Sequence, residues 1–399
     1  MKLLTADRVI TGRPGEVLER AGVLVDGTGI AWVGTLDGLT AERRADAEVI
    51  DLPGSSLLPG LIDCHVHLAF DASADPVAHM RRSTDTELVI LMLHSARELL
   101  MAGVTTARDL GARGFLDIGV KRAINEGLAE GPRLLTVTRP ITVTGGHCWF
   151  MGGEFDGLDA VRYAVRLHHR EGADLIKVMA TGGVMTPGSA HWHAQFSAEE
   201  LAAIVEESHR LDKRVAAHCH GTPGIVLAVG AGVDTIEHCS WLARGGVQEY
   251  EPTVADAIAE ADIHVCPTVS CRSMTLGKER WERRAERLTW MREAGVQIVA
   301  GTDAGINLNP HGAYVGGLEA LVASGMSTAE VLEAATLRAA RALDLETVTG
   351  SLEAGKEADV IAVEGNPLTD IGNLRSPRLV MTRGRIAVGA PARTGNART

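Results

Sequence analysis

Histidine and aspartate residues stand at the ends of several strand-like runs in this sequence. His65 and His67 form an HxH pair, and a spacing of two in an extended chain directs both imidazoles to the same face. His218 and His238 lie in two later runs, and Asp303 ends another in Gly-Thr-Asp-Ala-Gly. An isolated HxH pair is commonly structural, but imidazole and carboxylate together are the usual ligands of Zn2+ and similar ions. The pattern therefore indicates a metal site.

A lysine interrupts another apolar run, Asp-Leu-Ile-Lys-Val-Met, at position 177. Burying an ammonium group costs several kcal/mol and lowers its pKa, so a lysine inside an apolar strand is rarely left unpaired. We therefore expect Lys177 to have a functional role beside the candidate metal ligands.

These residues must be positioned by a regular scaffold, and the region from Pro59 to about Gly350 alternates short β-branched runs with helical stretches. Eight such units over roughly 290 residues predict a (β/α)8 barrel of the TIM type, in which functional residues gather at the C-terminal ends of the strands. The expected strands are Gly60–Leu68, Val104–Asp109, Arg133–Ile141, Leu175–Thr181, Arg214–Cys219, Thr235–Cys239, His264–Ser270 and Gln297–Asp303. A doubly wound sheet is the competing architecture, but no GxGxxG turn follows the first run.

Both ends of the chain have a different pattern, with short strand-like runs joined by Gly-rich or polar connections. We expect them to pair into one small β-sandwich domain made of residues 1–57 and 351–389. The barrel would then span residues 58–350. Residues 390–399 are predicted to form a flexible tail, because they offer nothing to bury.

The composition excludes several classes of protein. Hydrophobic residues make up 45% of the 399 positions and charged residues 23%, which is typical of a globular α/β chain. The net charge of −12 makes nucleic acid and anionic membranes poor partners. No apolar run approaches the 18 or more residues of a membrane span, and the six cysteines show no CxxC pair. We expect a cytoplasmic protein, and a homo-oligomer.

Several motifs together resemble the amidohydrolase superfamily, in the branch of imidazolonepropionase-related proteins, Xaa-Pro dipeptidases (prolidases) and ochratoxinase-type amidases. The resemblance covers nearly the whole chain. It rests on Pro59-Gly-Leu-Ile-Asp-Cys-His-Val-His, Ile-Lys177-Val with Ala-Thr-Gly-Gly after it, Ala-Ala-His218, Thr-Ile-Glu-His238, Gly-Thr-Asp303-Ala-Gly and the closing Gly355-Lys-Glu-Ala-Asp-Val-Ile-Ala-Val.

The resemblance implies a site for two divalent ions, Zn2+ or similar, held by His65, His67, Lys177, His218, His238 and Asp303. The first two histidines would hold one ion and the other two the second, with a carbamate formed on Lys177 by CO2 as the bridge. Two ions about 3.5–4 Å apart acidify a shared water toward a pKa of about 7 and polarise a carbonyl. Asp303 would accept the proton of that water and pass it to the leaving amine.

Other residues are candidates for substrate contact. His147 follows the third run in Thr-Gly-Gly-His-Cys, and His220 shares the face of the strand-five histidine if the strand continues. The loop after the fourth run contains His191 and His193 and is expected to shape the pocket. Arg272 follows the seventh run and is a candidate for a substrate carboxylate. Each also has an ordinary explanation, as a loop histidine or a solvated basic residue.

We interpret the chain as a metal-dependent hydrolase that cleaves a C–N bond in an N-acyl amino acid, dipeptide or related small amide. One alternative is a hydrolase of a cyclic amide or lactone, or a deaminase-like hydrolase, on the same metals. Such members place a glutamate three residues after the strand-five histidine, and here that position is Gly221. A non-catalytic scaffold is a further alternative, but it would be expected to have lost ligands. The exact substrate and the native metal are not readable from the sequence.

Overall fold

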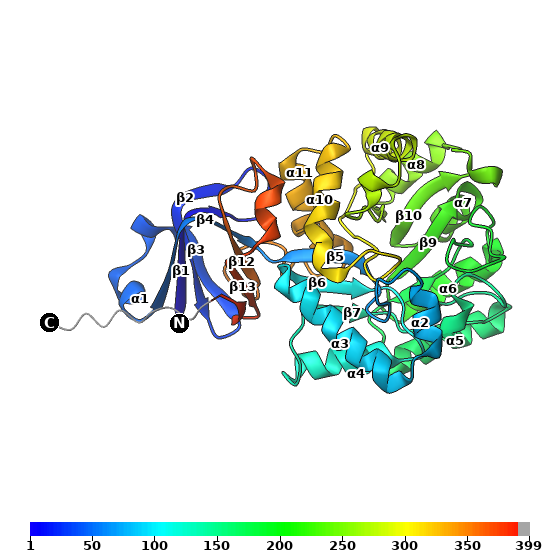
Figure 1. Cartoon of the computed structure of the whole chain (residues 1–399), viewed down its shortest axis with the longest axis horizontal. Helices are drawn as coiled ribbons and strands as arrows, with labels where there is room; N and C mark the ends of the chain where they lie inside the picture. Colours follow the sequence, from blue (N-terminus) through cyan, green and yellow to red (C-terminus); the bar gives the residue numbers. More distant parts are fainter. Residues whose placement is uncertain (390–399) are drawn as a thin grey trace.

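The computed structural model describes residues 1–389, which form a β-sheet at one end and a larger α/β body at the other (Figure 1). The tail predicted for residues 390–399 lies outside the described part of the chain.

The sheet at one end takes its strands from both ends of the chain. Its order is β14-β13-β12-β4-β1-β2-β3. The strands are β1 (Lys2–Ile10), β2 (Val17–Asp26), β3 (Gly29–Thr35), β4 (Glu48–Pro59), β12 (Val360–Glu364), β13 (Leu379–Thr382) and β14 (Arg385–Val388), and the short helix α1 (Ala41–Ala45) connects β3 to β4. The blue and red strands therefore lie together in Figure 1.

All seven of these strands belong to a single sheet, which bends around its own core. Gly29 at the start of β3 forms an antiparallel bridge with Glu357, just before β12. Leu4, Val23 and Met381 are buried in a separate cluster that this sheet encloses. The expected two-layered arrangement thus takes the form of one curved sheet rather than two separate sheets.

The larger body contains two parallel sheets. One has the order β5-β6-β7 and the other β11-β10-β9-β8. Their strands are β5 (Leu61–Val66), β6 (Val104–Asp109), β7 (Arg133–Thr136), β8 (Ile176–Val178), β9 (Val215–Gly221), β10 (Thr235–Leu242) and β11 (His264–Cys266). Every residue of β5, β6 and β8 is buried, although Asp63, His65, Arg108, Asp109 and Lys177 interrupt their apolar and β-branched residues.

Helices surround these strands (Figure 1). They are α2 (Pro76–Arg82), α3 (Asp85–Met101), α4 (Leu116–Asn125), α5 (Leu158–Glu171), α6 (Ala198–Arg210), α7 (Thr222–Ala231), α8 (Pro252–Glu260), α9 (Lys278–Glu293), α10 (Tyr314–Ala323), α11 (Thr328–Ala334) and α12 (Leu337–Ala342). Helices α3, α6 and α11 each begin with a complete capping box, so their start points are encoded locally.

The segment 297–303, expected as the eighth strand, makes only isolated bridges. Ile298 bridges in parallel to Val265 of β11, and Ala304, directly after the segment, bridges in parallel to Val66 of β5. A regular ladder is interrupted because the Thr302 amide donates to the Asp63 side chain at 3.1 Å rather than to a neighbouring strand. On the other side of the body, Ile141 bridges Val178 of β8. Main-chain hydrogen bonds therefore continue across both gaps between the two parallel sheets.

A buried ion pair joins the sheet to the α/β body. Arg133 at the start of β7 lies 2.9 Å from a carboxylate oxygen of Asp359, whose side chain is fully buried beside β12. The same carboxylate accepts hydrogen bonds from Thr349, Thr382 and the amide of Arg383. This network fixes the base of the strands against the sheet built from the chain ends.

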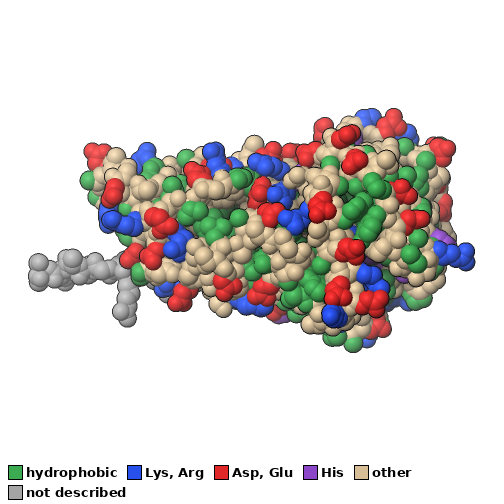
Figure 2. Space-filling view, turned by 90° about the horizontal axis from the view of Figure 1, so that it is seen from above, with side chains coloured by type: hydrophobic (Ala, Val, Ile, Leu, Met, Phe, Trp, Pro, Cys, Tyr) green, Lys and Arg blue, Asp and Glu red, His purple; other side chains and the backbone are tan. Residues whose placement is uncertain are grey.

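No helix within residues 1–389 has the length and apolarity needed to cross a membrane. On the face shown in Figure 2, acidic and basic side chains are interspersed over both bodies. Neither sign of charge gathers into one patch on this face.

We predict that Asp359→Ala lowers the free energy of unfolding by about 3–5 kcal/mol, because it leaves the largely buried Arg133 guanidinium with only the partly exposed Glu357 as a partner and removes the acceptor of three further hydrogen bonds. The matched control is Glu130→Ala, which removes an exposed partner of Arg97 and should cost less than about 1 kcal/mol. Denaturant titration of both variants measures the difference. Equal losses would show that the buried pair does not hold the two bodies together.

Candidate metal centre

The C-terminal ends of the parallel strands meet at one cavity of about 320 Å³. All six predicted metal-binding residues line it, together with two of the predicted substrate-contact histidines. These are His65, His67, Lys177, His218, His238, Asp303, His147 and His220. Residues far apart in the sequence are therefore brought to one place by the parallel arrangement of the strands.

Two of these residues have an unusual backbone conformation. His238 and Asp303 both have left-handed φ angles, of 65° and 59°. Such angles are uncommon for residues other than glycine and cluster where a side chain must be turned into a site. Gly301, two residues before Asp303, lets this segment pack closely against its neighbours. A Cβ at this position would lie 2.4 Å from the Cys266 sulfur and 3.0 Å from the His65 amide nitrogen. The close approach of these segments thus requires glycine.

His65, His67 and Asp303 form the first cluster. The Nε2 atoms of the two histidines lie 3.4 and 3.2 Å from the same oxygen of Asp303. Their Nδ1 atoms face groups that only accept, namely the ionised Glu237 carboxylate at 2.8 Å and the Gly111 carbonyl at 3.3 Å. In a neutral imidazole that donates through Nδ1, Nε2 carries a lone pair. Three acceptors therefore point at one another, an arrangement that needs a proton or a metal cation between them.

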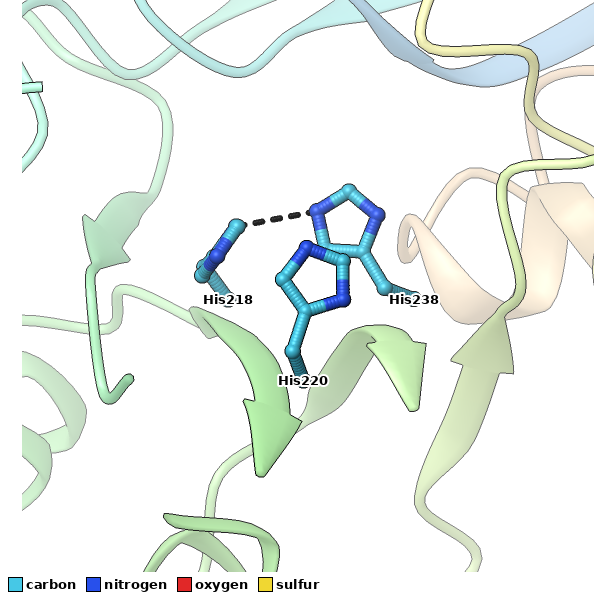
Figure 3. A group of neighbouring side chains, drawn as sticks. All are labelled: His218, His220 and His238. Carbon is cyan, nitrogen blue, oxygen red and sulfur yellow. Dashed lines mark hydrogen bonds between the residues drawn. The ribbon is translucent and has the colours of Figure 1, made fainter. Parts of the chain in front are cut away.

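His218 and His238 form the second cluster (Figure 3). His218 Nε2 faces the Gly182 carbonyl at 3.2 Å, so it donates there and leaves Nδ1 as an acceptor. That Nδ1 lies 2.9 Å from His238 Nε2, and His238 Nδ1 lies 2.8 Å from the Thr268 hydroxyl. Burial and the neighbouring imidazoles lower the pKa of both histidines well below the usual value. They are thus neutral, which is the form that binds metal.

His220 completes a group of three histidines in Figure 3. Its ring stacks on that of His238 with centroids 4.4 Å apart, and its Nδ1 lies 2.8 Å from the Ser240 hydroxyl. One ring nitrogen from each of His218, His220 and His238 lies within 4.8 Å of the others. Strand β9 extends to Gly221 and so includes His220. This meets the condition under which His220 was predicted to share a face with His218.

Lys177 lies at the bottom of this arrangement. Its side chain is 1% exposed, and its Nζ atom has no hydrogen-bond partner among the described residues. Burial lowers the pKa of Lys177, and Arg108 adds to this effect while Glu237 opposes it. An unmodified ammonium here would be a buried donor of three hydrogen bonds that makes none.

Sequence reasoning did not identify Arg108 and Glu237 as part of the site. Glu237 is fully buried between His65 and Arg108. One oxygen of its carboxylate faces His65 Nδ1, and the other lies 2.7 Å from the guanidinium of Arg108. Burial alone would raise the pKa of Glu237, but Arg108 and His65 outweigh it and lower the pKa to about 2. A glutamate directly before a candidate ligand and an arginine inside an apolar run were the available signals. Their pairing could not be seen without the fold.

The candidates for substrate contact separate into two groups. His147 and Arg272 line the cavity, as His220 does. Burial lowers the pKa of His147 to about 3, so its imidazole is neutral. His191 does not line the cavity, although its ring lies 6.2 Å from that of His220. His193 is exposed and lines a separate surface hollow, so the structure does not bring it to the site.

Residues 56–387 match the model of the Amidohydrolase family, so the chain belongs to that family, as its sequence motifs predicted. Ochratoxinase of Aspergillus niger is 32% identical over 413 residues, covering 92% of this chain and 82% of that protein. An imidazolonepropionase of Geobacillus kaustophilus is 26% identical over 386 residues, covering 86% and 84%. A crystal structure of a Xaa-Pro dipeptidase with bound methionine has a TM-score of 0.86 at 30% identity, covering 97% of this chain and 100% of that one. The chain is an enzyme, a hydrolase acting on carbon–nitrogen bonds.

We predict that Thr268→Val weakens the binding of divalent metal about 10–100-fold, because valine has the same shape but cannot accept from His238 Nδ1. Competition with a chromogenic chelator measures the affinity. Thr105→Val is the control, since Thr105 is equally buried but its hydroxyl makes no hydrogen bond among residues 1–389. Unchanged affinity in Thr268→Val would contradict the assigned role of the hydroxyl.

Proposed function

We propose that this protein is a binuclear metal-dependent hydrolase that cleaves the amide or peptide bond of a small N-acyl amino acid, dipeptide or related amide. The observation that supports this most strongly is the convergence of imidazole lone pairs and the Asp303 carboxylate on one cavity. We further propose that the parallel strands and segment 297–303 form a closed (β/α)8 barrel over residues 58–350, beside a small β domain of residues 1–57 and 351–389.

The donor set fits two divalent ions, with Zn2+ as the proposed metal. His65, His67 and Asp303 would hold one ion, and His218 and His238 the other. Each of these histidines has its second ring nitrogen against a carboxylate, carbonyl or hydroxyl, which is the usual support of a metal-binding imidazole. When bound, two such ions acidify a shared water and polarise a carbonyl.

Lys177 is proposed to be carboxylated by CO2 and to connect the two clusters. Its Nζ is buried and has no hydrogen-bond partner within residues 1–389, so the neutral amine that attacks CO2 is favoured there. The reaction converts an unpaired basic group into an anion, and an anion is what a site holding two cations requires. The carbamate nitrogen retains one proton, and the second is released to solvent.

Asp303 is proposed to move the proton of the reaction. The carboxylate takes a proton from the attacking water and delivers it to the leaving nitrogen, as a general acid–base group must. The cation that His65 and His67 would hold beside this carboxylate favours its ionised form, so Asp303 begins as the base. His147 lines the same cavity with a neutral imidazole and is available to bind the substrate carbonyl.

The residue at position 221 argues against the deaminase-like alternative. A Cβ on Gly221 would lie 2.7 Å from the main chain of Trp192, so the glutamate that such enzymes carry there would displace that loop. This close packing favours hydrolysis of a linear amide over the deaminase-like alternative.

The test is metal-dependent hydrolysis of defined amides. Protein depleted by a chelator should lose activity toward N-acyl amino acids and Xaa-Pro or Xaa-aromatic dipeptides, and Zn2+, Mn2+ or Co2+ should restore it. Retention of full activity after complete metal removal would reject the proposal. Activity restored only toward lactones or cyclic amides would select the alternative.

We predict that Asp303→Asn lowers kcat by about 10²–10⁴-fold, because the amide cannot accept a proton. The fold and much of the bound metal should remain, since the amide oxygen still coordinates weakly. Steady-state kinetics with parallel metal analysis measures both quantities. A variant that keeps more than about a tenth of the original kcat would move the proton-transfer role to another group.

A further inference from the structure

One wall of the metal-site cavity is basic. Arg272, from the segment between β11 and α9, lines it together with Arg280 and Arg284 of α9. The remaining charged residues of the lining are Lys177 and Asp303, which belong to the metal centre. The part of the cavity outside that centre therefore has cationic side chains and, within residues 1–389, no acidic ones.

These three arginines lack carboxylate partners in the described part of the chain. None of them lies within 4.0 Å of an aspartate or glutamate oxygen there, whereas several other arginines do. Arg283 on the same helix is the clearest contrast, because it pairs with Glu279 at 2.7 Å. Positive charge along the cavity is thus left unbalanced.

Arg284 is the most enclosed of the three. Its Nη1 donates to the Thr268 carbonyl and the Ser273 hydroxyl, both at 3.1 Å. Burial, with added repulsion from Arg287 and Arg280, lowers the pKa of Arg284. An arginine stays protonated even so, and the direction of this effect means that an anion beside it would be strongly favoured.

The anchoring of Arg284 also determines where such an anion would lie. Thr268 offers its main-chain carbonyl to Arg284 and its side-chain hydroxyl to His238. The guanidinium is therefore fixed one residue away from a proposed metal ligand. Its Nε and Nη2 groups make no hydrogen bond within residues 1–389, and they are the donors that would grip a carboxylate in the bidentate manner.

We propose that Arg284, assisted by Arg272 and Arg280, is the specificity-determining residue of this enzyme and binds a free carboxylate on the substrate. This inference rests on the proposed function and narrows it. The preferred substrates are amides whose amino-acid part has a free α-carboxylate, whereas the corresponding carboxamides are poor substrates.

The test uses matched substrates that differ only at that group, an N-acyl amino acid and its carboxamide. The metal-loaded wild-type enzyme should prefer the carboxylate, and Arg284→Met should lose at least about 30-fold in kcat/KM for it, mainly through KM. The kcat/KM for the carboxamide should change less than about twofold, and Arg284→Lys should be intermediate because lysine retains charge but not the bidentate geometry. Arg283→Met is the control and should behave as wild type.

Two further measurements keep the outcomes distinct. Metal analysis of Arg284→Met should give the wild-type content, and a loss of metal would overturn the inference by showing that the residue only supports Thr268. Wild-type enzyme that hydrolyses both substrates equally well would also overturn it while leaving the proposed function intact. Failure to hydrolyse any linear amide would instead reject the proposed function.

Discussion

Each imidazole of the two clusters has one ring nitrogen directed at an outer carboxylate, carbonyl or hydroxyl group, and this constraint decides what the other nitrogen can do. For His65, His67 and His218 the outer group is a carboxylate or a main-chain carbonyl, which can only accept. The inner nitrogen of a neutral ring must then present a lone pair. A protein that directs several lone pairs and the Asp303 carboxylate at one another gains no stability from them unless a cation lies between.

A buried ion pair below the histidines and unusual backbone conformations at the strand ends keep this arrangement in place. Glu237 holds His65, and the fully buried Arg108 neutralises Glu237 while also donating to the Cys64 carbonyl at 2.7 Å. Breaking such a pair is costly, because it would leave an uncompensated buried charge. At the strand ends, the left-handed φ angles of His238 and Asp303 turn the side chains into the cavity at a local conformational cost. The site is thus positioned by charges beneath it and by strained backbone at its edge.

The sequence predicted more of the residues that line the cavity than of their surroundings. Runs with β-branched residues and an HxH spacing are local signals, so the histidines, Lys177 and Asp303 are recognisable as candidate ligands from the sequence, and the fold places all of them in one cavity. The segment 297–303 was expected as a strand but makes only isolated bridges, because the Asp63 side chain takes the Thr302 amide. Neither this contact nor the basic wall around Arg284 leaves a local pattern, since both depend on residues far apart in the chain. His193 belongs to the loop that the sequence predicts to shape the pocket, but its side chain is exposed and lines a separate surface hollow.

We propose that the histidine lone pairs, Asp303 and Lys177 together form a site for two cations. Anomalous diffraction from crystals of the zinc-loaded protein, recorded above and below the zinc edge, tests it most directly. We expect two peaks per chain, one among His65, His67 and Asp303 and one between His218 and His238, with density for a carboxylate on Lys177 Nζ reaching both. Two peaks around an unmodified Lys177 would contradict the carbamate. A single peak, or none, would contradict the binuclear site itself.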